Sequence, residues 1–151
     1  MIYNLIEKNN CVNSKTSKKV LAFGTFDIFH AGHENFLKQA KKQGDYLIVV
    51  VARDKTVTGL KGRIPRNREK ARLDSVKQSG LVDRAVLGSL GDKYAVIKKY
   101  RPNVICLGYD QKYFTENLIT KLAEFGLART RVVRLKPYKA RIYKSSKLIN
   151  L

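Results

Sequence analysis

Apolar residues gather in five short runs, and the segments between them are rich in charged residues. Residues 46–52 read Tyr-Leu-Ile-Val-Val-Val-Ala, a continuous run dominated by β-branched residues. Such a run is typical of a strand that is covered on both faces. Shorter runs of the same kind predict strands over residues 20–23, 84–87, 104–107 and 131–135.

Helical spacing of apolar residues appears between these runs. Residues 31–43 place Phe36, Leu37 and Ala40 on one side of a helix. The segment 53–66 is basic and is interrupted by Gly and Pro, so we interpret it as a loop. Further helices are expected over residues 67–78, 92–100 and 116–125, and a short one over residues 145–151.

Strands that alternate with helices of this length predict βαβ units and a parallel sheet. The pattern therefore predicts an α/β fold whose crossover connections are right-handed. We expect a Rossmann-like, doubly wound, five-stranded parallel sheet in a three-layer α/β/α sandwich. A chain of 151 residues has the size of one domain. We expect that domain to span residues 18–151, after an N-terminal extension of residues 1–17.

The charge is the unusual feature of the composition. The chain has 31 Lys and Arg against 12 Asp and Glu, a formal net charge of +19. Such a field attracts polyanions, which include nucleic acids, nucleotides and phosphorylated small molecules. The basic residues are spread along the chain without a recognisable nucleic-acid-binding motif. The charge alone therefore does not choose among these partners.

Other features of the composition narrow the class. No apolar run approaches the roughly 18–20 residues that cross a bilayer, and the N-terminus has no signal-peptide pattern. We therefore expect a soluble, cytoplasmic protein with no membrane partner. Cys11 and Cys106 make no disulfide framework, and together with two His they are too few for a structural zinc site. No metal-ligating set is expected in the chain itself.

Ligands of doubly wound folds bind beyond the carboxyl ends of the strands. This rule selects residues 24–33, 53–66 and 108–111. In the first of these segments, Gly24 ends a strand and the next helix begins near Ala31, so free N–H groups face the same place. His30 and His33 lie three residues apart and share one face of that helix. Preorganised donors of this kind suit nucleophilic attack at phosphorus.

The signature Gly24-Thr25-Phe26-Asp27-x-x-His30-x-Gly32-His33 resembles that of the cytidylyltransferase-like nucleotidyltransferases. A P-loop and a dinucleotide fingerprint are both absent. The resemblance extends through Arg72 before the third strand and covers roughly residues 18–151. Within the superfamily it is greatest to the archaeal-type FAD synthases (FMN adenylyltransferases), on Ala52-Arg53-Asp54-Lys55 and Gly108-Tyr109-Asp110-Gln111.

The resemblance implies that ATP and FMN are the substrates and that FAD and pyrophosphate are the products. Mg²⁺ is then expected as MgATP, bound to the nucleotide more than to the chain. His30 and His33 would bind the phosphates and stabilise the transition state. Asp27, the third residue of the implied catalytic group, either orients the loop or helps to hold Mg²⁺.

The implied nucleotide-binding residues come from four segments. The backbone of the first loop would cradle the triphosphate, and Lys55 and Lys61 would close over it from a mobile loop. Asp110 would accept from the ribose or the base, and the Ser-Ser pair would open the last helix at a phosphate. The full set is Gly24, Thr25, Phe26, Gly32, Lys55, Lys61, Gly108, Tyr109, Asp110, Ser145 and Ser146.

Two other functions stay open at this point. Glycerol-3-phosphate cytidylyltransferases are similar at the His motif, so a CTP-dependent enzyme acting on a small phosphate ester is an alternative. A basic nucleic-acid-binding protein is a second, but it gives no reason for the ordered His motif, and no specific nucleic acid is expected. A homodimer is the oligomer that the resemblance implies. One aromatic side chain could stack on the flavin, among Tyr109, Tyr113, Phe114, Tyr138 and Tyr143.

Overall fold

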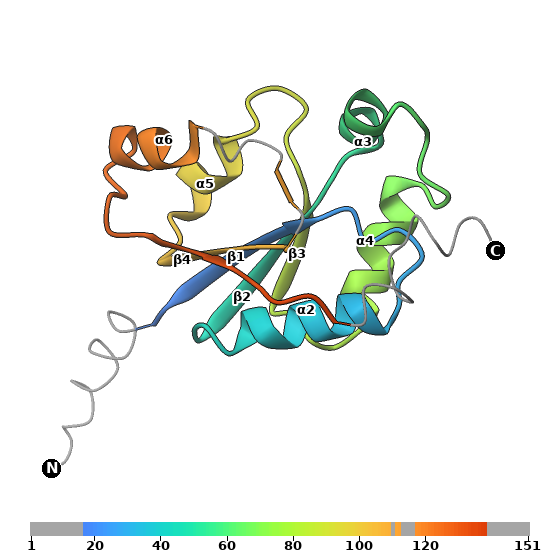
Figure 1. Ribbon diagram of the computed structural model, residues 1–151, viewed down its shortest axis with the longest axis horizontal. Helices are drawn as coiled ribbons and strands as arrows, with labels where there is room; N and C mark the ends of the chain where they lie inside the picture. Colours follow the sequence, from blue (N-terminus) through green and yellow to red (C-terminus); the bar gives the residue numbers. More distant parts are fainter. Residues whose placement is uncertain (1–16, 110, 113–116, 139–151) are drawn as a thin grey trace, which may run out of the picture.

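The computed structural model describes residues 17–109, 111–112 and 117–138. Within them the chain forms one five-stranded sheet in the order β3-β2-β1-β4-β5, with every neighbouring pair parallel (Figure 1). This confirms the α/β fold and the parallel five-stranded sheet expected from the hydrophobic pattern. The strands are β1 (Lys19–Gly24), β2 (Tyr46–Val51), β3 (Arg84–Leu87), β4 (Val104–Leu107) and β5 (Arg131–Arg134).

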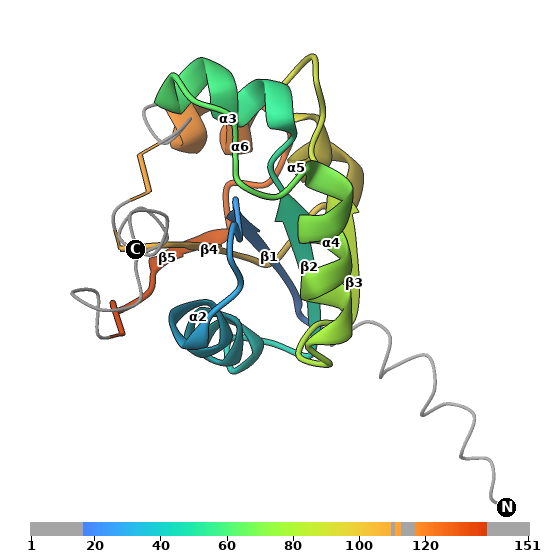
Figure 2. The same cartoon turned by 90° about the vertical axis from the view of Figure 1, so that its right-hand side faces the viewer.

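Two helices cover each face of the sheet, which gives three layers (Figures 1 and 2). On one face, α2 (Ala31–Lys41) and α4 (Glu69–Gln78) pack against β1, β2 and β4. On the other face, α5 (Ala95–Tyr100) and α6 (Leu118–Glu124) pack against the alternate residues of the same strands. Both faces are apolar because each side of every central strand meets a helix. The buried strand residue Cys106 is part of this core.

The interpretation of residues 53–66 as a loop is wrong. They contain α3 (Asp54–Lys61), followed by a turn at Gly62. The glycine that suggested a break is the helix C-cap, in the left-handed region at φ 70°. Asp54 lies in the first helical turn and Val57 is buried, so the helix has both a favourable start and an apolar contact. The predicted helices at 67–78 and 92–100 begin two and three residues later than expected.

The strand order determines where along the sheet a ligand crevice can form. The chain moves outward from β1 through β2 to β3, then returns to β4 on the other side of β1. The helices therefore leave β1 and β4 on opposite faces, and a crevice opens between these two strands at their carboxyl ends. α3 follows the carboxyl end of β2 at the same edge (Figure 1). Among the described residues, no helix combines the length and apolar character that a membrane span requires.

Candidate active site

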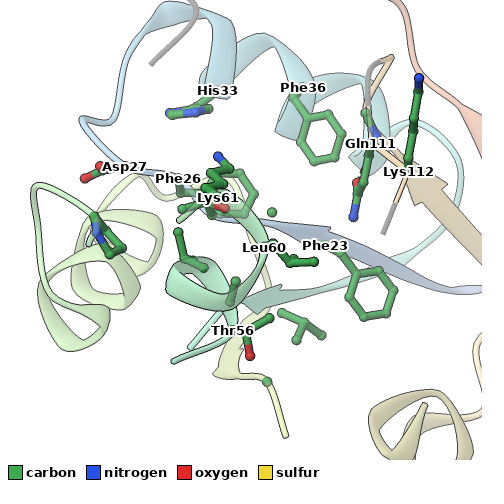
Figure 3. Close-up of a pocket in the computed structure, with 18 of the residues that line it drawn as sticks. Phe23, Phe26, Asp27, His33, Phe36, Thr56, Leu60, Lys61, Gln111 and Lys112 are labelled. Atoms are coloured by element: carbon green, nitrogen blue, oxygen red, sulfur yellow. Dashed lines mark hydrogen bonds between the residues drawn. The ribbon is translucent and has the colours of Figure 1, made fainter. Parts of the chain in front are cut away.

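A cavity of about 490 Å³ opens at the carboxyl edge of the sheet (Figure 3). Its size falls in the range of about 300–1,000 Å³ that is usual for small-molecule sites. Segments that follow all five strands contribute to its wall, including two that the sequence did not select, residues 88–96 and 136–138. Ten of the expected site residues line it: Gly24, Thr25, Phe26, Asp27, His30, Gly32, His33, Lys61, Gly108 and Tyr109.

The two histidines stack at the N-terminus of α2. Their ring centroids are 3.8 Å apart and the ring planes are inclined by 21°. His30 is the N-cap, and its Nδ1 accepts a hydrogen bond of 3.0 Å from the backbone N–H of Gly32. In the neutral ring the proton is therefore on Nε2, which leaves a donor at the opposite end of the imidazole.

Burial favours the neutral form of both rings. The ring of Phe26 lies edge-on to His33 at 5.3 Å between centroids, and that of Phe29 lies at 5.5 Å. Desolvation among these rings, together with His30 and the ammonium of Lys61, lowers the pKa of His33 to about 3. Burial also lowers the pKa of His30. The site thus offers uncharged donors beside the positive end of the α2 dipole.

The loop between β1 and α2 has an unusual backbone. Phe26 and Ile28 adopt positive φ angles of 55° and 51°, a region that side chains rarely occupy. The ring of Phe26 lies so close to Gly24 that a Cβ at that glycine would be 2.7 Å from its Cε2. Gly24 is therefore required here by the packing of Phe26, in addition to the close ligand approach expected from the sequence.

Asp27 joins this loop to the segment before α4. The residue is 4% exposed, and its Oδ2 accepts from the backbone N–H of Arg66 at 2.8 Å. Its Oδ1 accepts from the backbone N–H of Asn67 at 2.9 Å and from the Asn67 amide at 3.3 Å. Both oxygens are thus used within the protein, which favours the loop-orienting role of Asp27 over a direct Mg²⁺ contact.

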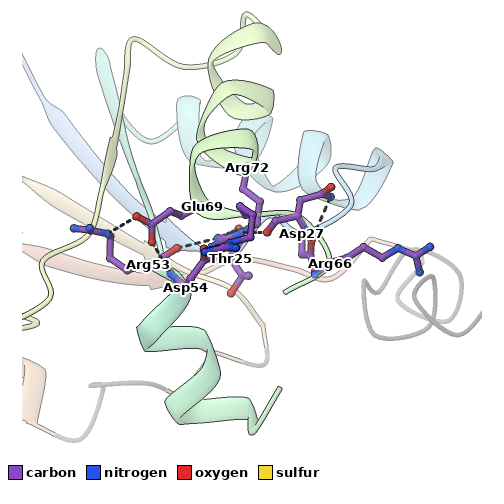
Figure 4. Close-up of polar contacts among 10 residues, drawn as sticks. Thr25, Asp27, Arg53, Asp54, Arg66, Glu69 and Arg72 are labelled. Atoms are coloured by element: carbon purple, nitrogen blue, oxygen red, sulfur yellow. Dashed lines mark hydrogen bonds and ion pairs between the residues drawn. The ribbon is translucent and has the colours of Figure 1, made fainter. Parts of the chain in front are cut away.

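Arg72 connects four segments around the same edge (Figure 4). Its side chain is fully buried, and Nη1 donates to the carbonyls of Thr25 at 2.8 Å and Ala52 at 2.9 Å. Nε donates to the carbonyl of Asn67, and Nη2 pairs with Asp54 at 2.7 Å. From the sequence alone, Arg72 was noted only as part of the family resemblance. The tertiary structure makes it the link between the His loop, the end of β2 and the start of α3.

Positive charge surrounds the cavity. Among the described residues, six cationic side chains line it and Asp27 is the single carboxylate. Lys61 is one of the six, on α3 and near His33 (Figure 3). Lys55 is exposed on the same helix but does not line the cavity, so the two lysines expected to act together are separated. The six are Arg53, Lys61, Arg63, Lys93, Lys112 and Lys136.

The segment after β4 forms a closed turn beside the cavity. The backbone N–H of Gly108 donates to Oε1 of Gln111 at 3.1 Å, and Tyr109 is 40% exposed at the cavity wall. Asp110, Ser145 and Ser146, also expected at the site, lie outside the described residues. No group of three or more potential metal ligands among His, Cys, Asp and Glu occurs in the part of the chain that the structure describes.

Comparison with known proteins agrees with this geometry. The chain is 41% identical to an FAD synthase of Thermoplasma volcanium, over 85% of this chain and 89% of that protein. It is 47% identical to an FAD synthase of Methanosarcina barkeri, over 78% and 82%. A crystal structure described as a lipopolysaccharide core biosynthesis protein from Thermoplasma volcanium matches with a TM-score of 0.75 and 41% identity, over 82% of this chain and 99% of that one. The cytidylyltransferase-like family model matches residues 21–150, and the chain therefore belongs to the cytidylyltransferase-like family.

Proposed function

We propose that this chain is an FAD synthase, which transfers the AMP moiety of ATP to FMN and releases pyrophosphate. The stacked His30–His33 pair in a cation-lined cavity is the observation that carries the phosphoryl-transfer chemistry. FMN as the acceptor follows from relatives of 41–47% identity that are FAD synthases.

The reaction needs no covalent intermediate with the protein. An oxygen of the FMN phosphate attacks the α-phosphorus of ATP, a new P–O–P bond forms, and the bond to the β-phosphate oxygen breaks. That oxygen takes the bonding electron pair and leaves as part of pyrophosphate. Because the nucleophile is already anionic and the leaving group is a good one, the protein contributes positioning and charge stabilisation.

His30 and His33 supply donors for the charge that develops on the phosphoryl oxygens. A donor that stays neutral can bind a phosphoryl oxygen without electrostatic repulsion from the nearby Mg²⁺ and lysine cations. Because Nδ1 of His30 accepts from the Gly32 N–H, the donor of the neutral ring is Nε2–H. The α2 dipole and Lys61 add positive potential at the same point. Backbone groups of residues 24–26, with Gly32 at the helix start, complete the phosphate cradle in this proposal.

Mg²⁺ enters this mechanism with ATP as part of the substrate. Six cationic side chains at the cavity supply the remaining neutralisation, and both oxygens of Asp27 are held by residues 66 and 67. The adenosine half is assigned to the β4 side, at Gly108 and Tyr109, with Asp110 as a further contact carried over from the family resemblance. The same resemblance assigns Ser145 and Ser146 to a phosphate. Lys55 is not among the residues that line the cavity, so the structure gives no support for its expected role.

The test is a matrix of donors and acceptors. Purified protein with Mg²⁺ is incubated with ATP or CTP and with FMN or glycerol 3-phosphate, and pyrophosphate release and FAD formation are both followed. FAD and pyrophosphate in equal amounts, formed only with ATP and FMN, are expected. Turnover confined to CTP and glycerol 3-phosphate would replace this assignment with the cytidylyltransferase alternative.

A further inference from the structure

The turn after β4 is held from two directions. From within, the backbone N–H of Gln111 donates to the carbonyl of Gly108 at 3.2 Å, and the Gln111 side chain accepts from the Gly108 N–H at 3.1 Å. From outside, Nη1 of Arg134 donates to both the Gly108 carbonyl and the Gln111 carbonyl, each at 2.7 Å. The first and last residues of the turn are therefore tied by one guanidinium nitrogen.

Strand register explains how Arg134 reaches this position. β5 pairs with β4 in parallel, with Arg134 opposite Leu107. The pairing continues one step further, where the N–H of Leu135 donates to the carbonyl of Leu107 at 2.8 Å. The side chain of Arg134 thus leaves β5 at the level where the chain leaves β4.

Arg134 acts on the cavity through the turn. Gly108, Tyr109 and Gln111 line the cavity, whereas Arg134 is not among its lining residues. A short turn on its own has several accessible conformations, and hydrogen bonds from a charged donor restrict them more strongly than neutral ones. Tyr109 follows Gly108 directly in the chain and lies at the cavity wall.

We propose that Arg134 is a positioning residue for the nucleoside half of the donor nucleotide. It holds Gly108 and Gln111, on either side of the base-binding position, and so sets the affinity for ATP while the chemistry at His30 and His33 proceeds independently. The inference rests on the proposed function only in taking ATP as the donor. We expect the loss of Arg134 to change Kd and KM for ATP and to leave kcat nearly unchanged.

The experiment compares three variants with the wild-type protein. Arg134→Met removes both bonds, and Arg134→Lys keeps one nitrogen, which suffices in principle because one nitrogen makes both contacts. Arg131→Met is the matched control: Arg131 is an exposed arginine at the opposite end of β5, and its Nη2 lies 3.5 Å from Oε1 of Gln43. Calorimetry with Mg²⁺ and α,β-methylene ATP gives Kd, and steady-state assays with FMN give KM and kcat.

Arg134→Met should raise Kd and KM for ATP on the order of tenfold, which corresponds to about 1.4 kcal/mol. Its kcat should stay within about twofold of wild type. Arg134→Lys should recover most of the affinity, and Arg131→Met should match wild type. An unchanged Kd in Arg134→Met, a loss confined to kcat, or an equal effect in Arg131→Met would each overturn the inference. If wild type binds the analogue but makes no FAD, the proposed function fails while the comparison of Kd values stands.

Discussion

The imidazole of His30 stacks on that of His33 with 3.8 Å between ring centroids. Only one ring caps the helix: His30 accepts the Gly32 N–H, while His33 is enclosed by Phe26 and Phe29. The two histidines of the motif therefore have different surroundings. His30 caps the helix and, in the proposed function, also supplies a catalytic donor, so substitutions can separate the two tasks.

His30→Asn tests that separation. Asparagine is among the best N-cap residues, so α2 should keep its start and the melting temperature should change little. The Nε2 donor is lost, and loss of one such donor is expected to lower kcat about 10²–10³-fold. His30→Ala removes both functions and should also lower the melting temperature. A kcat for His30→Asn near that of wild type would exclude His30 as a catalytic donor.

His33 should make the protein sensitive to acid. Its pKa is about 3 in the folded chain against an ordinary value of 6.5, so between these values only the unfolded chain binds the proton. The free energy of unfolding should then fall as pH is lowered, by about 1 kcal/mol between pH 6 and pH 5. Urea unfolding of wild type and His33→Asn at pH 7, 6 and 5 measures this. Identical slopes in both proteins would contradict the burial of a neutral His33.

Asp27→Asn separates the two roles considered for this residue. An amide replaces one carboxylate oxygen that accepts from the Arg66 or Asn67 backbone, and a buried bond is lost. We expect about 1–3 kcal/mol of destabilisation and an unchanged Mg²⁺ concentration for half-maximal activity. The exposed Asp74→Asn is the control and should alter neither quantity. A raised Mg²⁺ requirement with unchanged stability would make Asp27 a metal ligand instead.

Two arginines on the carboxylate of Asp54 differ sharply in burial. The side chain of Arg72 is 0% exposed and that of Arg68 is 79% exposed. Arg72→Met should cost about 3–5 kcal/mol in unfolding free energy, because Asp54 loses its buried partner and three carbonyls lose their donor. Arg68→Met should be much closer to wild type, since surface pairs contribute little. Denaturant unfolding measures the unfolding free energy of both variants. Equal losses of unfolding free energy would refute the central position of Arg72.

The linear sequence determined the architecture and the location of the two histidines at the cavity. Continuous β-branched runs such as residues 46–51 are typical of strands covered on both faces, and helical segments between them predict parallel pairing. The carboxyl-edge rule then placed His30 and His33 at the ligand crevice, and the cavity contains both. These features can be predicted from one sequence, because they depend on the local hydrophobic pattern and on general topology rules.

The tertiary structure decided what depends on contacts between distant residues. Arg72 meets Thr25 and Ala52 across 47 and 20 residues, and Arg134 meets Gly108 across 26. No periodicity signals such pairs, because a lone arginine in a basic chain looks like part of a solvated surface. α3 was missed for a related reason: its glycines suggested a loop, while the burial of Val57 and the bonds of Asp54 stabilise the helix only in the folded chain. The hydrophobic pattern defined most of the helices and strands, whereas hydrogen bonds between residues far apart in the sequence defined the shape of the site.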